Sequence, residues 1–381
     1  MTFPDKALGD LITLQRGFDI TKEQQVEGSV PIVSSSGIAS FHNESKVRAP
    51  GVVIGRKGSL GTVHFVDEDF WPHDTTLWVK DFKGNDPRFI GYFLKTLHLE
   101  VFDTGSSNPT LNRNHVHKIK VQCEPPATQC KIAAILSAYD DLIANNQRRI
   151  ALLEGMAEEI YREWFVRRRA PSDLKGGEAG WHEKRFDELC VFRKGRTPVE
   201  VFGLPAGELA PYLSVDVLDG NAPTEWVEPR KNDVIAEPDD VVMLMDGARS
   251  GVVFRGASGV VGSTASLVET ADANRAMVFE YLKAMREVIV WNNTGSAIPH
   301  ANKGFIHRML VPVPRDVRVL EAFNLLYEPF FNEQQALHRG NLQLRRARDA
   351  LLPRLISGKL KVDHLDIRLP PSMRAEAEAV A

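Results

Sequence analysis

Side chains suited to reading nucleic-acid bases gather in two stretches of the chain that repeat one another. Thr104 to His117 (TGSSNPTLNRNHVH) is matched by Thr294 to His307 (TGSAIPHANKGFIH), 190 residues later and without a gap. Six of the fourteen pairs are identical. Arginine and lysine suit guanine, and asparagine and glutamine suit adenine. A chain built twice fits a partner that also presents itself twice, and duplex DNA is the obvious example.

The candidate base-reading residues lie in these two stretches and in a Gly-containing turn upstream of each. In the first copy they are Arg56, Lys57, Ser59, Ser106, Asn108, Thr110, Asn112 and Arg113, and in the second Arg249, Ser250, Ser296, His300, Asn302 and Lys303.

Residues that both copies share cannot distinguish two different half-sites, so a loop-shaping role is favoured for them. Positions at which the copies differ are the better reading candidates. They are Arg56 against Asp246, Asn108 against Ile298 and Thr110 against His300.

The repeat extends beyond these loops to the elements that must position them. The stretches 52–63 and 242–253 each predict a buried strand, a turn and a returning strand. Near the start of each copy, 8–17 faces 186–195 at a smaller separation of 178 residues, so the second copy carries about a dozen extra residues between 196 and 240. Each copy therefore predicts a strand-rich domain followed by a long helix.

The first helix is predicted over about 128–167. Its apolar seam steps alternately by four and three residues, which is the pattern of a coiled coil. The seam residues are Ile132, Leu136, Tyr139, Ile143, Asn146, Ile150, Leu153, Ala157, Ile160 and Trp164. Asn146 is the polar residue in this seam, a position that can fix the register of the pairing.

The second helix is less regular. Gln334, Asn341 and Arg348 interrupt its seam, Pro329 is expected to kink or start it, and Pro353 is expected to disturb its last turn. Two interpretations remain open: the helices bury each other as an antiparallel pair, which is favoured, or each packs only on its own domain.

Composition excludes several classes of protein. The net charge of −3 argues against a generally basic nucleic-acid binder but leaves room for a local basic face. Three scattered cysteines indicate a reducing compartment. No signal peptide or long apolar run is present, so a cytoplasmic protein without membrane contact is expected.

Motifs of a self-sufficient enzyme are missing. Gly55 to Gly61 resembles a phosphate-binding loop but leads into another strand, so a hairpin turn is favoured. Glu124-Pro-Pro-Ala127 lacks the aromatic residue of an adenine methyltransferase loop and is interpreted as the stop before the helix. His115, His117, Cys123 and Cys130 fit no zinc spacing, and three of the four are lost in the second copy. His117 and His307 are expected to pack the loops or to face phosphate.

Over nearly the whole chain, this organisation resembles the DNA specificity subunit of type I restriction–modification systems. The more specific motifs are 152–166 (LLEGMAEEIYREWFV) and 348–360 (RDALLPRLISGKL), which resemble the ends of the family's two spacer helices. The resemblance implies an α+β fold with an internal pseudo-two-fold. Two target recognition domains (1–127 and 170–314) are joined by antiparallel helices (128–169 and 315–362), with a flexible tail at 363–381.

The resemblance also implies a non-catalytic subunit that reads a split DNA sequence and docks two methyltransferase subunits, with restriction and translocase subunits joining them. Docking is expected at Arg148, Trp164, Phe165, Arg345 and Arg354. S-adenosylmethionine, ATP and magnesium are expected only on the partner subunits, whose complex would methylate adenine and cut DNA. The alternative is a coiled-coil scaffold that binds protein without reading DNA.

Overall fold

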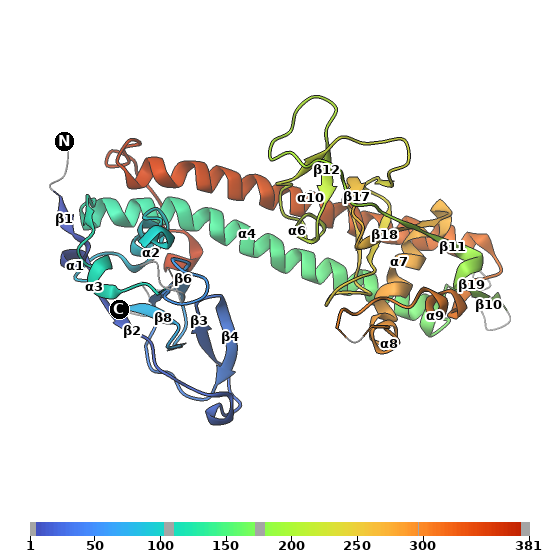
Figure 1. Cartoon of the computed structure of the whole chain (residues 1–381), viewed down its shortest axis with the longest axis horizontal. Helices are drawn as coiled ribbons and strands as arrows, with labels where there is room; N and C mark the ends of the chain where they lie inside the picture. The colour runs from blue at the N-terminus through green and yellow to red at the C-terminus, as the bar shows by residue number, and fades with distance from the viewer. Residues whose placement is uncertain (1–4, 103–109, 172–179, 296, 375–381) are drawn as a thin grey trace. The chain divides into compact units, whose positions relative to one another are not determined.

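The chain folds into two compact units in a computed structural model (Figure 1), which describes residues 5–102, 110–171, 180–295 and 297–374. Unit 1 combines Met1–Ala144 with Gln343–Ala381, and unit 2 is Asn145–Leu342. Each unit joins one strand-rich domain to parts of two long helices. The predicted α+β architecture with two domains is therefore confirmed.

The strand-rich domain of unit 1 has a four-stranded sheet, a three-stranded sheet and a strand pair that closes the domain. The first has the order β2 (Thr13–Arg16), β8 (Thr76–Asp81), β5 (Gly51–Gly55), β6 (Val63–Val66). The second has the order β4 (Gly37–His42), β3 (Val30–Ser34), β7 (Trp71–Pro72), and the pair is β1 (Lys6–Ala7) with β9 (Lys120–Val121). The helices are α1 (Leu8–Leu11), α2 (Pro87–Lys95) and α3 (Arg113–Val116).

The domain of unit 2 repeats this plan. Its main sheet has the order β11 (Cys190–Lys194), β18 (Ala265–Thr270), β15 (Val241–Leu244), β16 (Val253–Arg255). The second sheet is β13 (Trp226–Val227), β12 (Ala210–Leu213), β17 (Gly259–Val261), β14 (Ile235–Ala236), and the closing pair is β10 (Trp181–Arg185) with β19 (Leu310–Pro314). The helices are α5 (Phe186–Leu189), α6 (Val215–Leu218), α7 (Arg275–Ala284), α8 (Arg286–Trp291) and α9 (Lys303–Arg308).

Strand register corrects the gap-free repeat by one residue. Val53 pairs with His64 on β6 and with Trp78 on β8, while Val242 pairs with Phe254 on β16 and with Leu267 on β18. Val242 is thus the counterpart of Val53 at a separation of 189 residues, whereas β6 and β16 keep 190. The turn of unit 2 is one residue longer, so Asp246 corresponds to Lys57 rather than to Arg56.

Both predicted long helices form. α4 runs over Pro126–Tyr161 and continues as a π-helix over Arg162–Val166, and α10 runs over Val317–Ile356. α10 is continuous through both prolines, so Pro329 does not start the second helix and Pro353 does not end it. Both prolines are exposed, so the carbonyl groups that lose a backbone donor face water, and buried Phe323, Tyr327 and Phe331 hold the helix around Pro329.

Contacts within each unit show that the two helices run antiparallel. In unit 2, the Asn146 amide donates to Asn341 Oδ1 at 2.9 Å, and Arg149 pairs with Glu333 at 2.6 Å. In unit 1, Arg348 donates to Asp140, which also accepts from the Tyr92 hydroxyl. Two of the three polar residues that weaken the second seam, Asn341 and Arg348, are therefore paired with polar residues of the first helix. The favoured interpretation, mutual burial of the helices, is confirmed.

Candidate DNA interface

The hairpin turn and the repeated loop lie side by side in both units. In unit 1, Lys57 forms a β-bridge with Thr110, and the Leu111 amide donates to the Arg56 carbonyl at 3.0 Å. In unit 2, Asp246 bridges His300, and the Ala301 amide donates to the Met245 carbonyl at 2.7 Å. The backbone therefore brings the two predicted sets of reading residues together in each domain.

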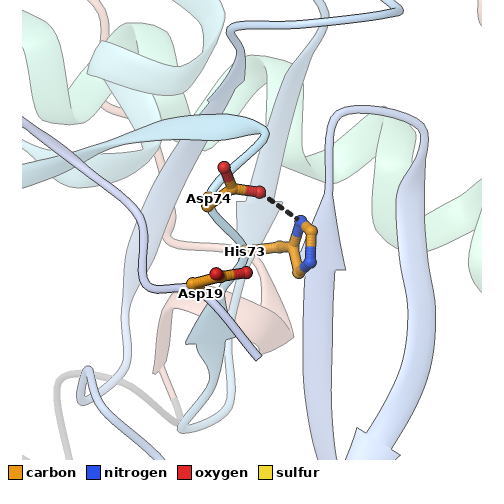
Figure 2. Close-up of side chains that lie close together, drawn as sticks. All are labelled: Asp19, His73 and Asp74. Carbon is orange, nitrogen blue, oxygen red and sulfur yellow. Dashed lines mark ion pairs between the residues drawn. The ribbon is translucent and has the colours of Figure 1, made fainter. Parts of the chain in front are cut away.

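In unit 1, one carboxylate lies close to two cationic side chains near the hairpin turn. Asp74 accepts from Arg16 at 2.8 Å and lies 3.9 Å from Lys57. His73 Nδ1 lies 3.3 Å from Asp74, and Asp19 stands beside this pair (Figure 2). Ligand atoms of Asp19, His73 and Asp74 come within 4.8 Å of one another, as in a metal site. Because two cationic side chains already share Asp74, the group fits a salt-bridge network better than a metal ion.

Arg56 stands next to this network, and its guanidinium donates to the Asp74 carbonyl at 3.5 Å. Burial, together with neighbouring Arg16, lowers its pKa despite the nearby Asp74 carboxylate. An arginine starts so far above neutral pH that the group stays charged. Arg56 and exposed Lys57 thus present two cations beside the loop that carries Thr110.

Unit 2 arranges its charges differently around the same backbone. Asp246 accepts from His300 at 2.8 Å and from Lys194 at 3.2 Å. Burial acts to raise the pKa of Asp246, but these two hydrogen bonds together hold it below its ordinary value. Lys194 ends β11 as Arg16 ends β2, so an equivalent cation meets a carboxylate in each unit, although Asp74 and Asp246 come from different loops.

The remaining candidates of unit 2 differ in their exposure to solvent. Arg249 holds Asp219 through two hydrogen bonds of 2.6 and 2.8 Å, which raise its pKa, and its guanidinium lies 5.6 Å from the Phe254 ring. Lys303 lies over the Phe192 ring. Ser250 is buried and accepts from the Asn293 amide at 2.7 Å. Ser250 is therefore corrected from a reading candidate to a residue that fixes the turn.

Residues shared by both copies hold the loops in place. Asn112 caps α3 by accepting from the Asn114 amide at 2.9 Å, and Asn302 caps α9 by accepting from the Phe305 amide at 3.0 Å. Asparagine is a favoured N-cap because its short side chain reaches the free amides of the first turn. These contacts give both asparagines the predicted loop-shaping role.

The shared histidines contact the equivalent strand position in both units. His117 Nε2 accepts from the Leu14 amide at 2.9 Å, and His307 stacks on Phe192, the counterpart of Leu14. Burial and the nearby cations Arg113 and Lys83 lower the pKa of His117, which favours the neutral ring that this hydrogen bond requires. Of the two roles expected for the histidines, loop packing is the one that these contacts support.

The other predicted residues fall in several settings. Ser59, Asn112, Arg113 and His300 are exposed. Ser106, Asn108 and Ser296 lie outside the described residues. Sequence reasoning missed Arg16, Lys194 and Asp74. Arg16 and Lys194 were recognisable, because both precede a repeated glycine at the end of the first strand.

The expected docking residues also differ in exposure. Phe165 is buried between Trp181 and Phe323, with ring centroids at 5.5 and 4.8 Å, so its expected direct contact with a partner is corrected to a role in the core of unit 2. Trp164 is half-buried against Phe323. Arg148 and Arg354 are exposed, and Arg345 is half-buried. Among the described residues, no helix is both long and apolar enough to span a membrane.

Parts of this sequence are similar to those of known proteins. Residues 2–155 match the family described as the type I restriction modification DNA specificity domain. The type I restriction enzyme MjaIX specificity subunit of Methanocaldococcus jannaschii is 22% identical over 73% of this chain and 70% of its own. The MjaVIII specificity subunit of the same organism is 24% identical over 43% of this chain and 37% of its own.

A solved structure extends the likeness to the fold. The type I restriction–modification S subunit from M. genitalium aligns with a TM-score of 0.60 at 16% identity, over 93% of this chain and 96% of its own. The sequence resemblance to the DNA specificity subunits of type I restriction–modification systems is therefore confirmed.

Proposed function

We propose that this chain is the non-catalytic subunit that gives a type I restriction–modification complex its DNA sequence specificity. Each strand-rich domain would read one half of a bipartite target. The observation that carries the proposal is the repeated turn-and-loop face, in which the same β-bridge joins turn to loop and the side chains differ. A conserved frame with different side chains suits recognition of two different half-sites.

The charges of the two faces support different readouts. Arg56 and Lys57 are cations suited to guanine edges or phosphate in the first face. In the second face, the Asp246 carboxylate takes the place of Lys57 and is held by Lys194 and His300. A carboxylate accepts hydrogen bonds from cytosine N4 and repels phosphate, so the second face should favour different bases.

The proposal includes the partners that such a subunit serves. Two methyltransferase subunits would dock on the helices, with Trp164, Arg148, Arg345 and Arg354 as candidate contacts, and restriction and translocase subunits would join them. S-adenosylmethionine, ATP and magnesium would bind those partners, and the assembled complex would methylate adenine and cut DNA in the cytoplasm. The paired helices would set the spacing between the half-sites, related by the pseudo-two-fold of the repeat.

A binding assay on the chain assembled with methyltransferase subunits tests the proposal. One duplex should be preferred over a scrambled duplex of equal length, and the preference should survive higher salt better than binding to the scrambled duplex does. Equal affinity for all duplexes, or no DNA binding, would instead favour a protein-binding scaffold.

A domain exchange tests the assignment of one half-site to each domain. Replacing residues 1–125 by the corresponding domain of another specificity subunit should change one half of the methylated motif and leave the other half intact. Methylation mapping measures this result. A change in both halves, or in neither, would contradict the modular arrangement.

A further inference from the structure

An exposed apolar side chain stands at the same place in both units, directly before the repeated loop. Trp291, the last residue of α8, is 88% exposed, and Val101, its counterpart at a separation of 190 residues, is 69% exposed. One exposed apolar residue is ordinary on a protein surface. Its recurrence at an equivalent position of two domains with different sequences requires an explanation.

A buried anchor fixes each of these residues. Ile289 and Leu99, two residues upstream, are each 1% exposed. Each anchor lies against the glycine that ends the hairpin turn. A Cβ on Gly251 would lie 3.2 Å from Ile289 Cγ2, and one on Gly61 would lie 3.0 Å from the Leu99 carbonyl carbon. The turn and the segment before the loop therefore pack closely in both units, and the exposed side chain follows from a fixed backbone.

In unit 2, this segment is also bonded to the candidate DNA interface. The Asn293 amide donates to Ser250 beside Arg249 at 2.7 Å. Thr294 then exchanges backbone hydrogen bonds of 2.7 and 2.9 Å with His300, the partner of Asp246. Trp291 therefore lies at the rim of the face that carries Arg249 and His300. In Figure 1, α8 lies at the lower edge of unit 2.

We infer that Trp291 and Val101 are apolar DNA contacts, one for each half-site, that bury against a thymine methyl group, a base face or a deoxyribose at the edge of the polar face. This inference rests on the proposed function and adds specificity-determining residues to it. Duplex DNA is the favoured occupant because both residues adjoin the turn and loop that carry the reading candidates. Tryptophan covers more surface than valine, so the two half-sites receive different contacts from the same backbone position.

The test measures the affinity of the chain, assembled with its methyltransferase subunits, for the cognate and a scrambled duplex. Trp291→Ala should weaken cognate binding about tenfold, because full burial of an aromatic side chain contributes about that much or more. Trp291→Phe should retain most of the affinity. Leu325→Ala removes a residue of similar exposure (81%) on α10 of the same unit and should leave DNA affinity unchanged.

The possible results separate the inference from the proposed function. Wild-type affinity for DNA in a folded Trp291→Ala complex overturns the inference, as does a defect confined to assembly with the methyltransferase. If the wild-type complex shows no sequence preference, the proposed function is wrong. The effect of Trp291→Ala on affinity for any duplex would still test whether Trp291 contacts DNA. Replacing each thymine by uracil identifies the contacted group. If Trp291 contacts a thymine methyl group, its loss weakens DNA binding by the wild type but not by Trp291→Ala. If Trp291 contacts a base ring or a sugar, the replacement leaves the affinity unchanged.

Discussion

At the scale of single residues, the two copies separate fold from recognition. Asn112 and Asn302 are identical, and the side chain of each caps the N-terminus of a helix. Lys57 and Asp246 are equivalent and carry opposite charges, and Lys57 is exposed whereas Asp246 is half-buried. A residue that is identical in both domains stabilises the loop that both domains share. A residue that differs between them can contact one half-site only.

Asn302 provides a direct test of this separation. Asn302→Ala should lower the free energy of unfolding by about 1 kcal/mol, because the amide of Phe305 loses its acceptor. Asn302→Ser should keep most of the stability, since serine is also a good cap. Complexes of both variants with methyltransferase subunits should methylate the wild-type motif, as measured by mapping of modified adenines. A changed motif with Asn302→Ser would show that the amide reads a base.

At the scale of elements, the sequence predicts what periodicity controls and misses what depends on individual contacts. The hairpins and both helices follow from the spacing of apolar residues. The extra residue in the turn of unit 2 is invisible in a gap-free comparison, because a turn can absorb one residue while the flanking strands keep their pairing. The continuity of α10 through Pro329 depends on which side of the helix faces water, and the position of the proline alone does not show this.

The pair formed by Asn146 and Asn341 should fix the register of the helices within unit 2. Asn146→Leu leaves Asn341, which is 5% exposed, without its hydrogen bond and should destabilise the chain by about 1–3 kcal/mol. The double variant Asn146→Leu/Asn341→Leu should recover this loss, because both polar groups are then replaced by apolar ones. Thermal unfolding of the two variants measures the difference. If the double variant is less stable than the single variant, the asparagine pair contributes to stability itself and not only to the register of the helices.

At the scale of the whole molecule, the candidate interface could be predicted only in part. The repeat identifies both loops, because related sequences must build related surfaces. It does not show that Asp74 gathers Arg16 and Lys57, since these residues lie far apart in the chain and meet only through sheet pairing. The repeat also does not show which side chains are exposed to solvent. Ser250 and Phe165 are therefore predicted as contact residues although both are buried.

The proposed spacing role of the helices leads to a prediction for the complete chain. Inserting one heptad into α4 after Asn145, with a second heptad in α10 after Leu342, keeps the seam in phase because the apolar pattern repeats every heptad. Each insertion adds about 10 Å of helix at roughly 1.5 Å per residue. If the helices lie along the duplex, the unspecified gap of the target should grow by about three base pairs at roughly 3.4 Å each, with both half-sites unchanged. Methylation mapping reads the gap directly. An insertion in α4 alone should shift Asn146 away from Asn341 and reduce stability instead, and a double insertion that leaves the gap unchanged would show that the helices do not set the spacing.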